Sequence, residues 1–174
     1  MQQIKQRFFA MRNGIVADTL RRAGLEYRMA FGLNLPQLVE IAADFEPSAE
    51  LAEQLWADRR TRESLLLAPM LYPHEALTER RAAEMLREAP TTEVADILCH
   101  RLLRHLPFAL KIAAEAATDE ADLTRYAAMR LMANLLYTYP EEIKPYAEAE
   151  LRRNTPLTSR LCTQILSEIT SLSD

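Results

Sequence analysis

Cys99, His100 and His105 are the residues whose types first suggest a chemical site, because thiolates and imidazoles are the usual protein ligands of zinc. Two histidines that bind one zinc ion from a helix stand four residues apart, which puts both rings on one face. Positions 100 and 105 are five apart, so the two rings point in different directions. We therefore expect no metal and no cofactor.

Asp96 is the carboxylate that stands out. It lies four residues after Thr92, at the start of an expected helix, where the helix dipole stabilises an acidic side chain by about 0.3–1 kcal/mol. Asp96 can therefore have a structural or solvated role as well as a catalytic one, since even a carboxylate with a perturbed pKa indicates a functional site only statistically. The acids that follow later are spread around their helix and indicate a solvated surface: Glu141, Glu142, Glu148 and Glu150.

Arginine dominates the basic residues, with 18 of the 21. Guanidinium groups suit phosphates and ion pairs better than ammonium groups do. Many recur near the ends of expected helices, where a stack of helices would align them: Arg59, Arg60, Arg62, Arg80, Arg81, Arg101, Arg104, Arg152 and Arg153. Two interpretations remain open, a basic track for nucleic acid and pairing with the 25 acids, since the net charge is −4.

The elements that position these residues are expected to be helices. No glycine follows Gly32, although tight hairpins between strands usually need Gly, Asn or Asp. The nine prolines stand mostly where a helix would start or end. The length of 174 residues suits one domain, and no apolar run is long enough for a membrane span or signal peptide. We expect an all-α, cytoplasmic protein that does not associate with membranes.

The first part of the chain predicts helices over 2–12, 14–23 and 36–44, with Gly24 as a left-handed cap and the irregular segment 25–34 lying on the core. Trp56, with Leu55 and Leu66, is expected inside the next helical pair. From there the helices come in pairs, 49–57 with 61–71, 79–89 with 93–105, 107–117 with 121–138, and 142–153 with 156–172. Ser48, Thr78, Thr92 and Thr155 are the expected N-caps. A repeated helical hairpin of this period indicates an α-solenoid of HEAT-like repeats spanning 1–174 as a single domain.

The segment 31–73 resembles the amino-terminal half of the HEAT-repeat DNA alkylation-repair glycosylases. The residues that carry the resemblance are Phe31-Gly32-Leu33-Asn34-Leu35-Pro36, then Leu38 and Ile41, then Ala52-Glu-Gln-Leu-Trp56, and then Arg62-Glu63 before Leu66-Leu-Ala68. It continues more weakly through 93–98 and 123–128.

This resemblance implies a curved stack whose concave basic face holds duplex DNA and excises alkylated bases without flipping them. Asp96 matches the family's catalytic aspartate, and Arg125 matches an arginine early in the following repeat. Thr92 stands where the family has a tryptophan, and a later tryptophan-bearing helix has no counterpart. Because a cationic base is held by aromatic faces, these departures imply that excision is absent or slow.

Three functions follow as hypotheses. The first is weak, non-specific binding of duplex DNA on the concave face, with contacts from Arg59, Arg60, Arg62, Arg101, Arg104 and Arg125. The alternative is a scaffold that holds a protein partner in the concave groove. The second alternative is an active DNA glycosylase for alkylated bases, with Asp96 as its catalytic residue.

Overall fold

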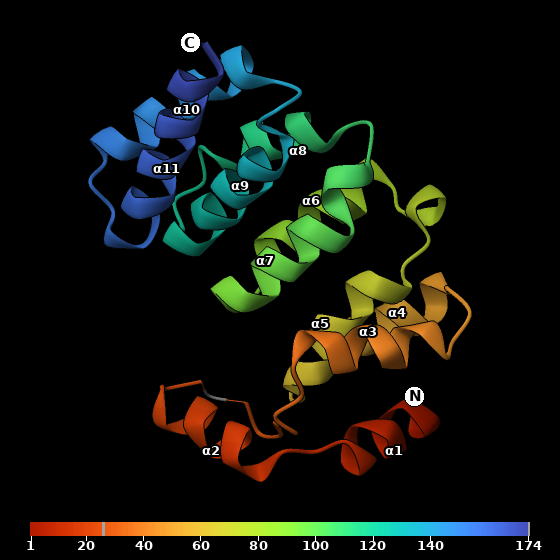
Figure 1. The fold of residues 1–174 in the computed structure, drawn as a ribbon. Coiled ribbons are helices and arrows are strands. Elements are labelled where there is room, and N and C mark those ends of the chain that lie inside the picture. Colours follow the sequence, from red (N-terminus) through yellow and green to blue (C-terminus); the bar gives the residue numbers. More distant parts are fainter. Residues whose placement is uncertain (26, 174) are drawn as a thin grey trace. The chain divides into compact units, whose positions relative to one another are not determined.

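A computed structural model describes residues 1–25 and 27–173, and within these residues the secondary structure is helical, with an isolated β-bridge between Met29 and Thr61 (Figure 1). The expected all-α class is confirmed, and the helices pack as in a helical repeat solenoid. None of the helices in the described residues is long and apolar enough to cross a membrane. Contacts cluster into two compact units, Met1–Leu77 and Thr78–Asp174, and each is described by itself.

Unit 1 is built from α1 (Gln2–Ala10), α2 (Gly14–Arg22), α3 (Leu35–Ala43), α4 (Ala49–Ala57), α5 (Arg62–Leu71) and the short 3₁₀ helix η1 (His74–Ala76). Helix α5 packs against both α3 and α4 and is covered along most of its length. Trp56 is 1% exposed and Leu55 and Leu66 are also buried, so the predicted core of this pair is confirmed. Gly24 takes the expected left-handed conformation, with φ of 85°.

The segment between α2 and α3 is fixed by a buried ion pair. The carboxylate of Glu63 accepts hydrogen bonds from the backbone N–H groups of Phe31, Gly32 and Leu33. Arg62 donates from Nη1 to the Leu33 carbonyl and to Glu63, at 3.0 and 2.9 Å. The first and the third parts of the resemblance, residues 31–33 and Arg62 with Glu63, are therefore joined in one hydrogen-bonded network. The expectation that 25–34 lies on the core holds for Leu33 but not for Met29, which is 39% exposed, and Glu26 lies outside the described residues.

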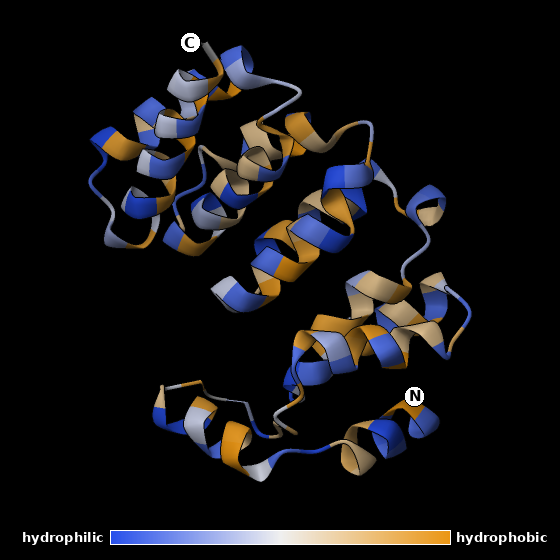
Figure 2. Cartoon of the chain, viewed as in Figure 1, coloured by the Kyte–Doolittle hydropathy of each residue, from blue (hydrophilic) through white to orange (hydrophobic). Residues whose placement is uncertain are grey.

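Unit 2 contains α6 (Glu79–Glu88), α7 (Thr92–Arg101), the 3₁₀ helix η2 (Leu103–His105), α8 (Ala109–Ala116), α9 (Asp122–Leu135), α10 (Pro140–Arg152) and α11 (Pro156–Ser173). Helix α9 is central, since it packs against α7 on one side and α11 on the other (Figure 1). Helices α6 and α8 pack against each other and against α9, and α10 packs against α9 and α11. Each helix alternates apolar with polar segments, as expected for elements with one buried side (Figure 2).

The expected N-caps of α4 and α6 are confirmed, the cap of α7 is not, and α8 and α10 each start two residues from the expected position. Ser48 and Thr78 accept hydrogen bonds from the backbone N–H groups of Leu51 and Arg81, as expected of N-caps. At α7 the cap is Thr91, whose hydroxyl accepts from Val94 N, and the expectation of Thr92 was wrong by one residue. Thr91 precedes the helix, whereas Thr92 is its first residue, and the N-cap is the residue just before the helix, whose side chain accepts from a free backbone N–H of the first turn.

Two prolines lie inside helices rather than at their ends, Pro69 in α5 and Pro145 in α10. Pro36, Pro140 and Pro156 stand in the first positions of α3, α10 and α11, as predicted. The expected helix over 93–105 is divided, because α7 ends at Arg101 and η2 follows.

Candidate nucleic-acid interface

Asp96 lies on α7 and is held by two side chains of α9. The Tyr126 hydroxyl donates to its Oδ1 atom over 2.9 Å, and Nε of Arg130 donates to the same atom over 2.7 Å. Nη2 of Arg130 also donates to the Tyr126 hydroxyl oxygen, and its guanidinium lies 5.7 Å from the centre of that ring. Both bonds to Asp96 end on Oδ1, so Oδ2 accepts no hydrogen bond from the described residues.

A hollow of about 340 Å³ opens beside this cluster, between α9 and α11. Tyr126 and Arg130 line it from α9, and α11 contributes Leu157, Arg160, Leu161 and Gln164. Arg160 is exposed and has no ion-pair partner among the described residues. The hollow therefore combines an unneutralised guanidinium with a second one that Asp96 neutralises, which suits an anionic ligand.

Burial and mutual contact set the ionisation of this cluster. Burial raises the pKa of Tyr126, and the nearby Asp96 adds to that effect while Arg130 opposes it. Burial alone would lower the pKa of Arg130, yet the contacts with Tyr126 and Asp96 leave it above its usual value. Arg130 is therefore cationic and Tyr126 is a neutral hydroxyl at physiological pH.

A second polar cluster follows one turn later on the same helices. Nδ1 of His100 lies 3.2 Å from Oδ1 of Asn134 on α9 and 3.3 Å from Nη1 of Arg104 on η2. Nε of Arg104 donates to Nε2 of His105 over 3.2 Å. Hydrogen bonds and the shared hollow thus connect one polar surface, which we call the α7/α9/α11 face: Asp96, His100, Arg104, Tyr126, Arg130, Asn134, Arg160 and Gln164.

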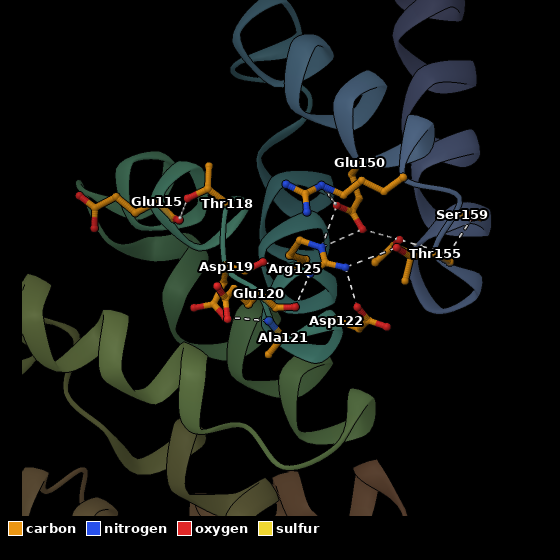
Figure 3. Close-up of polar contacts among 12 residues, drawn as sticks. Glu115, Thr118, Asp119, Glu120, Ala121, Asp122, Arg125, Glu150, Thr155 and Ser159 are labelled. Carbon is orange, nitrogen blue, oxygen red and sulfur yellow. Dashed lines mark hydrogen bonds and ion pairs between the residues drawn. The ribbon is translucent and has the colours of Figure 1, made fainter.

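Arg125 does not lie on this face, although the sequence suggested it as a DNA contact. It is 4% exposed, and its Nε donates to both carboxylate oxygens of Glu150 at 3.2 and 3.0 Å (Figure 3). Nη1 donates to the carbonyls of Asp119 and Glu120, and Nη2 donates to Asp122 and to the Thr155 hydroxyl. All five N–H groups are engaged, so Arg125 has no donor left for a phosphate.

The other arginines suggested by the sequence are divided between the two units. In unit 1, Arg59 and Arg60 are exposed, with Arg59 lying 4.8 Å from the centre of the Trp56 ring, whereas Arg62 is buried in the network around Glu63. In unit 2, Arg101 is half-buried and Arg104 belongs to the α7/α9/α11 face. Of this set, Arg104 is the one that joins this face, through its contact with His100.

Several remaining arginines form ion pairs with acids. Arg80 and Arg81 pair with Glu84 within α6, Arg87 pairs with Asp119, and Arg153 pairs with Glu150. Most of these pairs are exposed and contribute about 0–1 kcal/mol each to stability. Pairing with acids therefore accounts for much of the arginine content.

Cys99 differs from the histidines beside it because it is fully buried. Its Sγ atom lies 3.4 Å from the Ala127 carbonyl, and burial raises the pKa of its thiol far above the usual value. The thiol therefore stays protonated, which is unfavourable for a metal ligand. In the described part of the chain, no three His, Cys, Asp or Glu side chains gather as a group that could hold a metal ion.

Sequence reasoning missed Tyr126, Arg130 and Arg160, but a signal for the arginines was present. Arg130 follows Asp96 by 34 residues, and Arg160 follows Arg130 by 30 (160 − 130). These intervals are close to the period of the helical pairs, so the three residues occupy comparable positions on α7, α9 and α11. Arg125 follows Asp96 by 29 residues (125 − 96), which is also close to this period, so the period alone does not separate Arg130 from Arg125.

The repeated helical hairpins and the carboxylate–arginine cluster define a helical-repeat protein with an interface suited to an anionic ligand. The chain belongs to the DNA alkylation repair enzyme family, whose family model matches residues 4–166. Comparison with curated proteins and with solved structures gave no match. Family membership indicates a module related to DNA repair.

Proposed function

We propose that this chain binds duplex DNA weakly and without sequence preference through the α7/α9/α11 face of unit 2, and that it excises alkylated bases slowly or not at all. The observation that carries the proposal is that Arg130, which holds Asp96, and Arg160 line one hollow, with Arg104 on the same face through its contact with His100. Three cations and one carboxylate give this face a local charge of +2 (3 − 1) on a protein with a net charge of −4. Such a local excess attracts phosphates.

The expected binding is weak because the face carries few cations and the rest of the protein is acidic. Phosphate contacts supply affinity but read no bases, so sequence preference is not expected. Each neutralised phosphate releases counterions. A plot of the logarithm of the binding constant against the logarithm of the salt concentration should therefore have a slope of about −0.9 for each phosphate contact. Three arginines therefore predict a slope of about −3 at most.

Slow or absent excision follows from what surrounds Asp96. A cationic alkylated base is held by stacking on aromatic rings, and Thr92 on α7 offers no ring. Tyr126 is the aromatic residue in contact with Asp96, but it is 8% exposed and Arg130 lies over its ring. A base is consequently not gripped where the carboxylate could act on it.

The test is a titration of labelled duplex DNA by fluorescence anisotropy at low and moderate salt. Arg104→Ala and Arg160→Ala should each weaken binding severalfold and reduce the salt slope by about one. Arg80→Ala is the matched control, because it removes an exposed arginine from α6, outside the proposed face. Absence of binding at low salt would refute the proposal and favour a scaffold that binds a protein partner.

Excision remains the second candidate function because Oδ2 of Asp96 accepts no hydrogen bond from the described residues, and the two residues that hold Oδ1, Tyr126 and Arg130, line the hollow. Release of a methylated purine from duplex DNA should be measured for the natural protein and for Asp96→Asn. We expect no release from either. Release that Asp96→Asn abolishes would make the chain an active glycosylase.

A further inference from the structure

The hollow between α9 and α11 has the volume of a site for one small molecule. Its volume of about 340 Å³ lies near the lower end of the range of roughly 300–1,000 Å³ that ligand sites span. At roughly 30 Å³ for each water molecule, it holds about 11 of them. One nucleotide fits a hollow of this size, whereas a base pair, which consists of two nucleotides, does not.

The walls of this hollow divide into a cationic part and an apolar part. Arg130 and Arg160 supply two guanidinium groups, and Leu157 and Leu161 supply aliphatic side chains. Leu157 is 39% exposed, so a ligand that covers it removes apolar surface from water. Inorganic phosphate uses the guanidinium groups alone. A nucleotide uses both parts, because its phosphate is anionic and its base has an apolar face.

The cationic part keeps a positive charge after its neighbours are counted. Asp96 neutralises Arg130 over 2.7 Å, which leaves a charge of +1 (2 − 1) on the two arginines and this carboxylate. The next acid of α11, Glu168, accepts a hydrogen bond from the Gln164 amide. It lies eight residues after Arg160 (168 − 160), about 12 Å along the helix, and forms no ion pair with it in the described part of the chain. The guanidinium of Arg160 therefore remains available to an anion.

The charge and the position of a phosphate in DNA decide how well it fits this hollow. A phosphate inside a strand is a diester with one negative charge, whereas a phosphate at a strand end is a monoester with a charge of about −1.5 to −2 at pH 7. The cationic part attracts the monoester more strongly. A base inside a duplex must also be unpaired and unstacked before it can enter the hollow, whereas a base in a single-stranded end is already unpaired.

We propose that this hollow binds a nucleotide that carries a phosphomonoester, with the phosphate on Arg160 and Arg130 and the base against Leu157 and Leu161. Two ligands share this chemistry, the phosphorylated end of a DNA strand and a free nucleoside monophosphate. The strand end is the expected ligand, because the α7/α9/α11 face adds further phosphate contacts to it. This form of the inference rests on the DNA binding proposed above and adds a preference for strand ends over continuous duplex.

The experiment compares duplexes of one sequence that carry an internal fluorescent label and a short single-stranded overhang at one end. The overhang ends in a hydroxyl group or in a phosphate, and it is tested both as a 5′ end and as a 3′ end. Fluorescence anisotropy should give an affinity about threefold to tenfold higher for the phosphorylated overhang of at least one polarity, because charge-assisted hydrogen bonds hold its phosphate. Isothermal titration calorimetry with deoxyadenosine monophosphate, and with deoxyadenosine as its control, tests the free nucleotide.

The ratio of the affinities for phosphorylated and for hydroxyl ends is the readout in the variants. Arg160→Ala removes a guanidinium and Leu157→Ala removes an apolar contact, so each should reduce this ratio to below about twofold. Arg80→Ala and Leu172→Ala are the matched controls, because they remove an exposed arginine of α6 and an exposed leucine of α11 that do not line the hollow. Both controls should keep the full ratio. Circular dichroism verifies that all four variants fold.

A ratio near one for both polarities, together with no heat from deoxyadenosine monophosphate, would refute the inference, while binding of the hydroxyl-ended duplex decides the proposed function separately. A full ratio in Leu157→Ala would also refute it, since the base would then lie outside the hollow. Heat from deoxyadenosine monophosphate that Arg160→Ala abolishes, without an effect of the end phosphate, would identify the free nucleotide as the ligand, whether or not duplex DNA binds.

Discussion

Arg125 and Arg130 lie on the same helix, α9, but differ in what surrounds them. Arg125 is enclosed by Glu150, Asp122, Thr155 and two carbonyls, so it joins α9 to α10 and to the start of α11. Arg130 is partly exposed and faces Asp96 and the hollow. The resemblance to the family suggested the first as a DNA contact, and the proposed interface contains the second instead.

Arg125→Ala should destabilise the protein by about 3–5 kcal/mol, because it leaves the buried carboxylate of Glu150 without its guanidinium partner. Urea unfolding measures this loss. Arg160→Ala is the control, since it removes an exposed arginine of α11 and should leave stability nearly unchanged. A small effect of Arg125→Ala would show that Thr158, which also donates to Glu150, and solvent satisfy that carboxylate.

Asp58 should make stability depend on pH in the acidic range. Lys5 of α1 lies 2.9 Å from its Oδ2 atom, and the Ser64 hydroxyl of α5 donates to the same atom over 2.9 Å. Burial alone would raise the pKa of Asp58, but these contacts leave it below the usual value of 3.8. The pKa of Asp58 is lower in the folded protein than in the unfolded chain. Its ionised form therefore stabilises the folded protein above about pH 4, and this stabilisation is lost as the pH falls through the pKa of the folded state.

Asp58→Asn should therefore lower the melting temperature at neutral pH and flatten its decrease on acidification. Thermal melts between about pH 7 and pH 3 measure both effects. Asp18→Asn is the control, because Asp18 pairs with Arg21 at an exposed position of α2 and should contribute little. An unchanged acid dependence in Asp58→Asn would contradict the assignment.

At the scale of elements, the connection between α2 and α3 depends on Gly32. Its φ is 76°, and a Cβ atom there would lie 2.2 Å from the Asn13 carbonyl oxygen and 2.8 Å from Ala17 N. Backbone atoms cannot move aside cheaply, so α2 approaches this segment closely only because residue 32 has no side chain.

Gly32→Ala should consequently destabilise the protein by more than the roughly 1–3 kcal/mol typical of backbone strain alone. Gly14→Ala is a matched control, since a Cβ at Gly14 meets nothing within 4 Å and alanine favours helix α2. Differential scanning calorimetry of the two variants checks the difference. Equal melting temperatures would mean that α2 can move away from the 25–34 segment without cost.

The sequence predicted the helices well because their start signals and apolar spacing are local. Ser48 and Thr78 cap helices as expected, and Trp56 is in the core. Prediction from the sequence failed where the burial of a side chain depends on contacts with residues distant in the chain. Nothing local distinguishes the buried Arg125 from the partly exposed Arg130, because Glu150 and Asp96, which make the difference, are 25 and 34 residues away.

At the scale of the whole molecule, the protein has a net charge of −4, yet it belongs to a family of DNA alkylation repair enzymes. A protein with this net charge can bind DNA only where its positive side chains are concentrated on one part of the surface. The α7/α9/α11 face provides this concentration within residues 96–164, entirely inside unit 2. Ion pairs neutralise several of the other arginines, among them Arg62, Arg80 and Arg125. Binding should therefore depend on this unit and not on the total charge of the protein.

Residues 78–174 should fold by themselves and retain the DNA affinity of the full chain within about threefold. The hydrogen bonds of the face and the Arg125–Glu150 pair all lie within this unit, and Thr78 keeps its role as the N-cap of α6. Residues 107–174 are the control, because this shorter piece removes α7 and exposes the side of α9 that α7 covers. Circular dichroism should record a cooperative thermal transition for 78–174 and none for 107–174. If 78–174 is unfolded, unit 2 requires unit 1 for stability; if it folds but binds no DNA while the full chain does, the interface includes arginines of unit 1 such as Arg59 and Arg60.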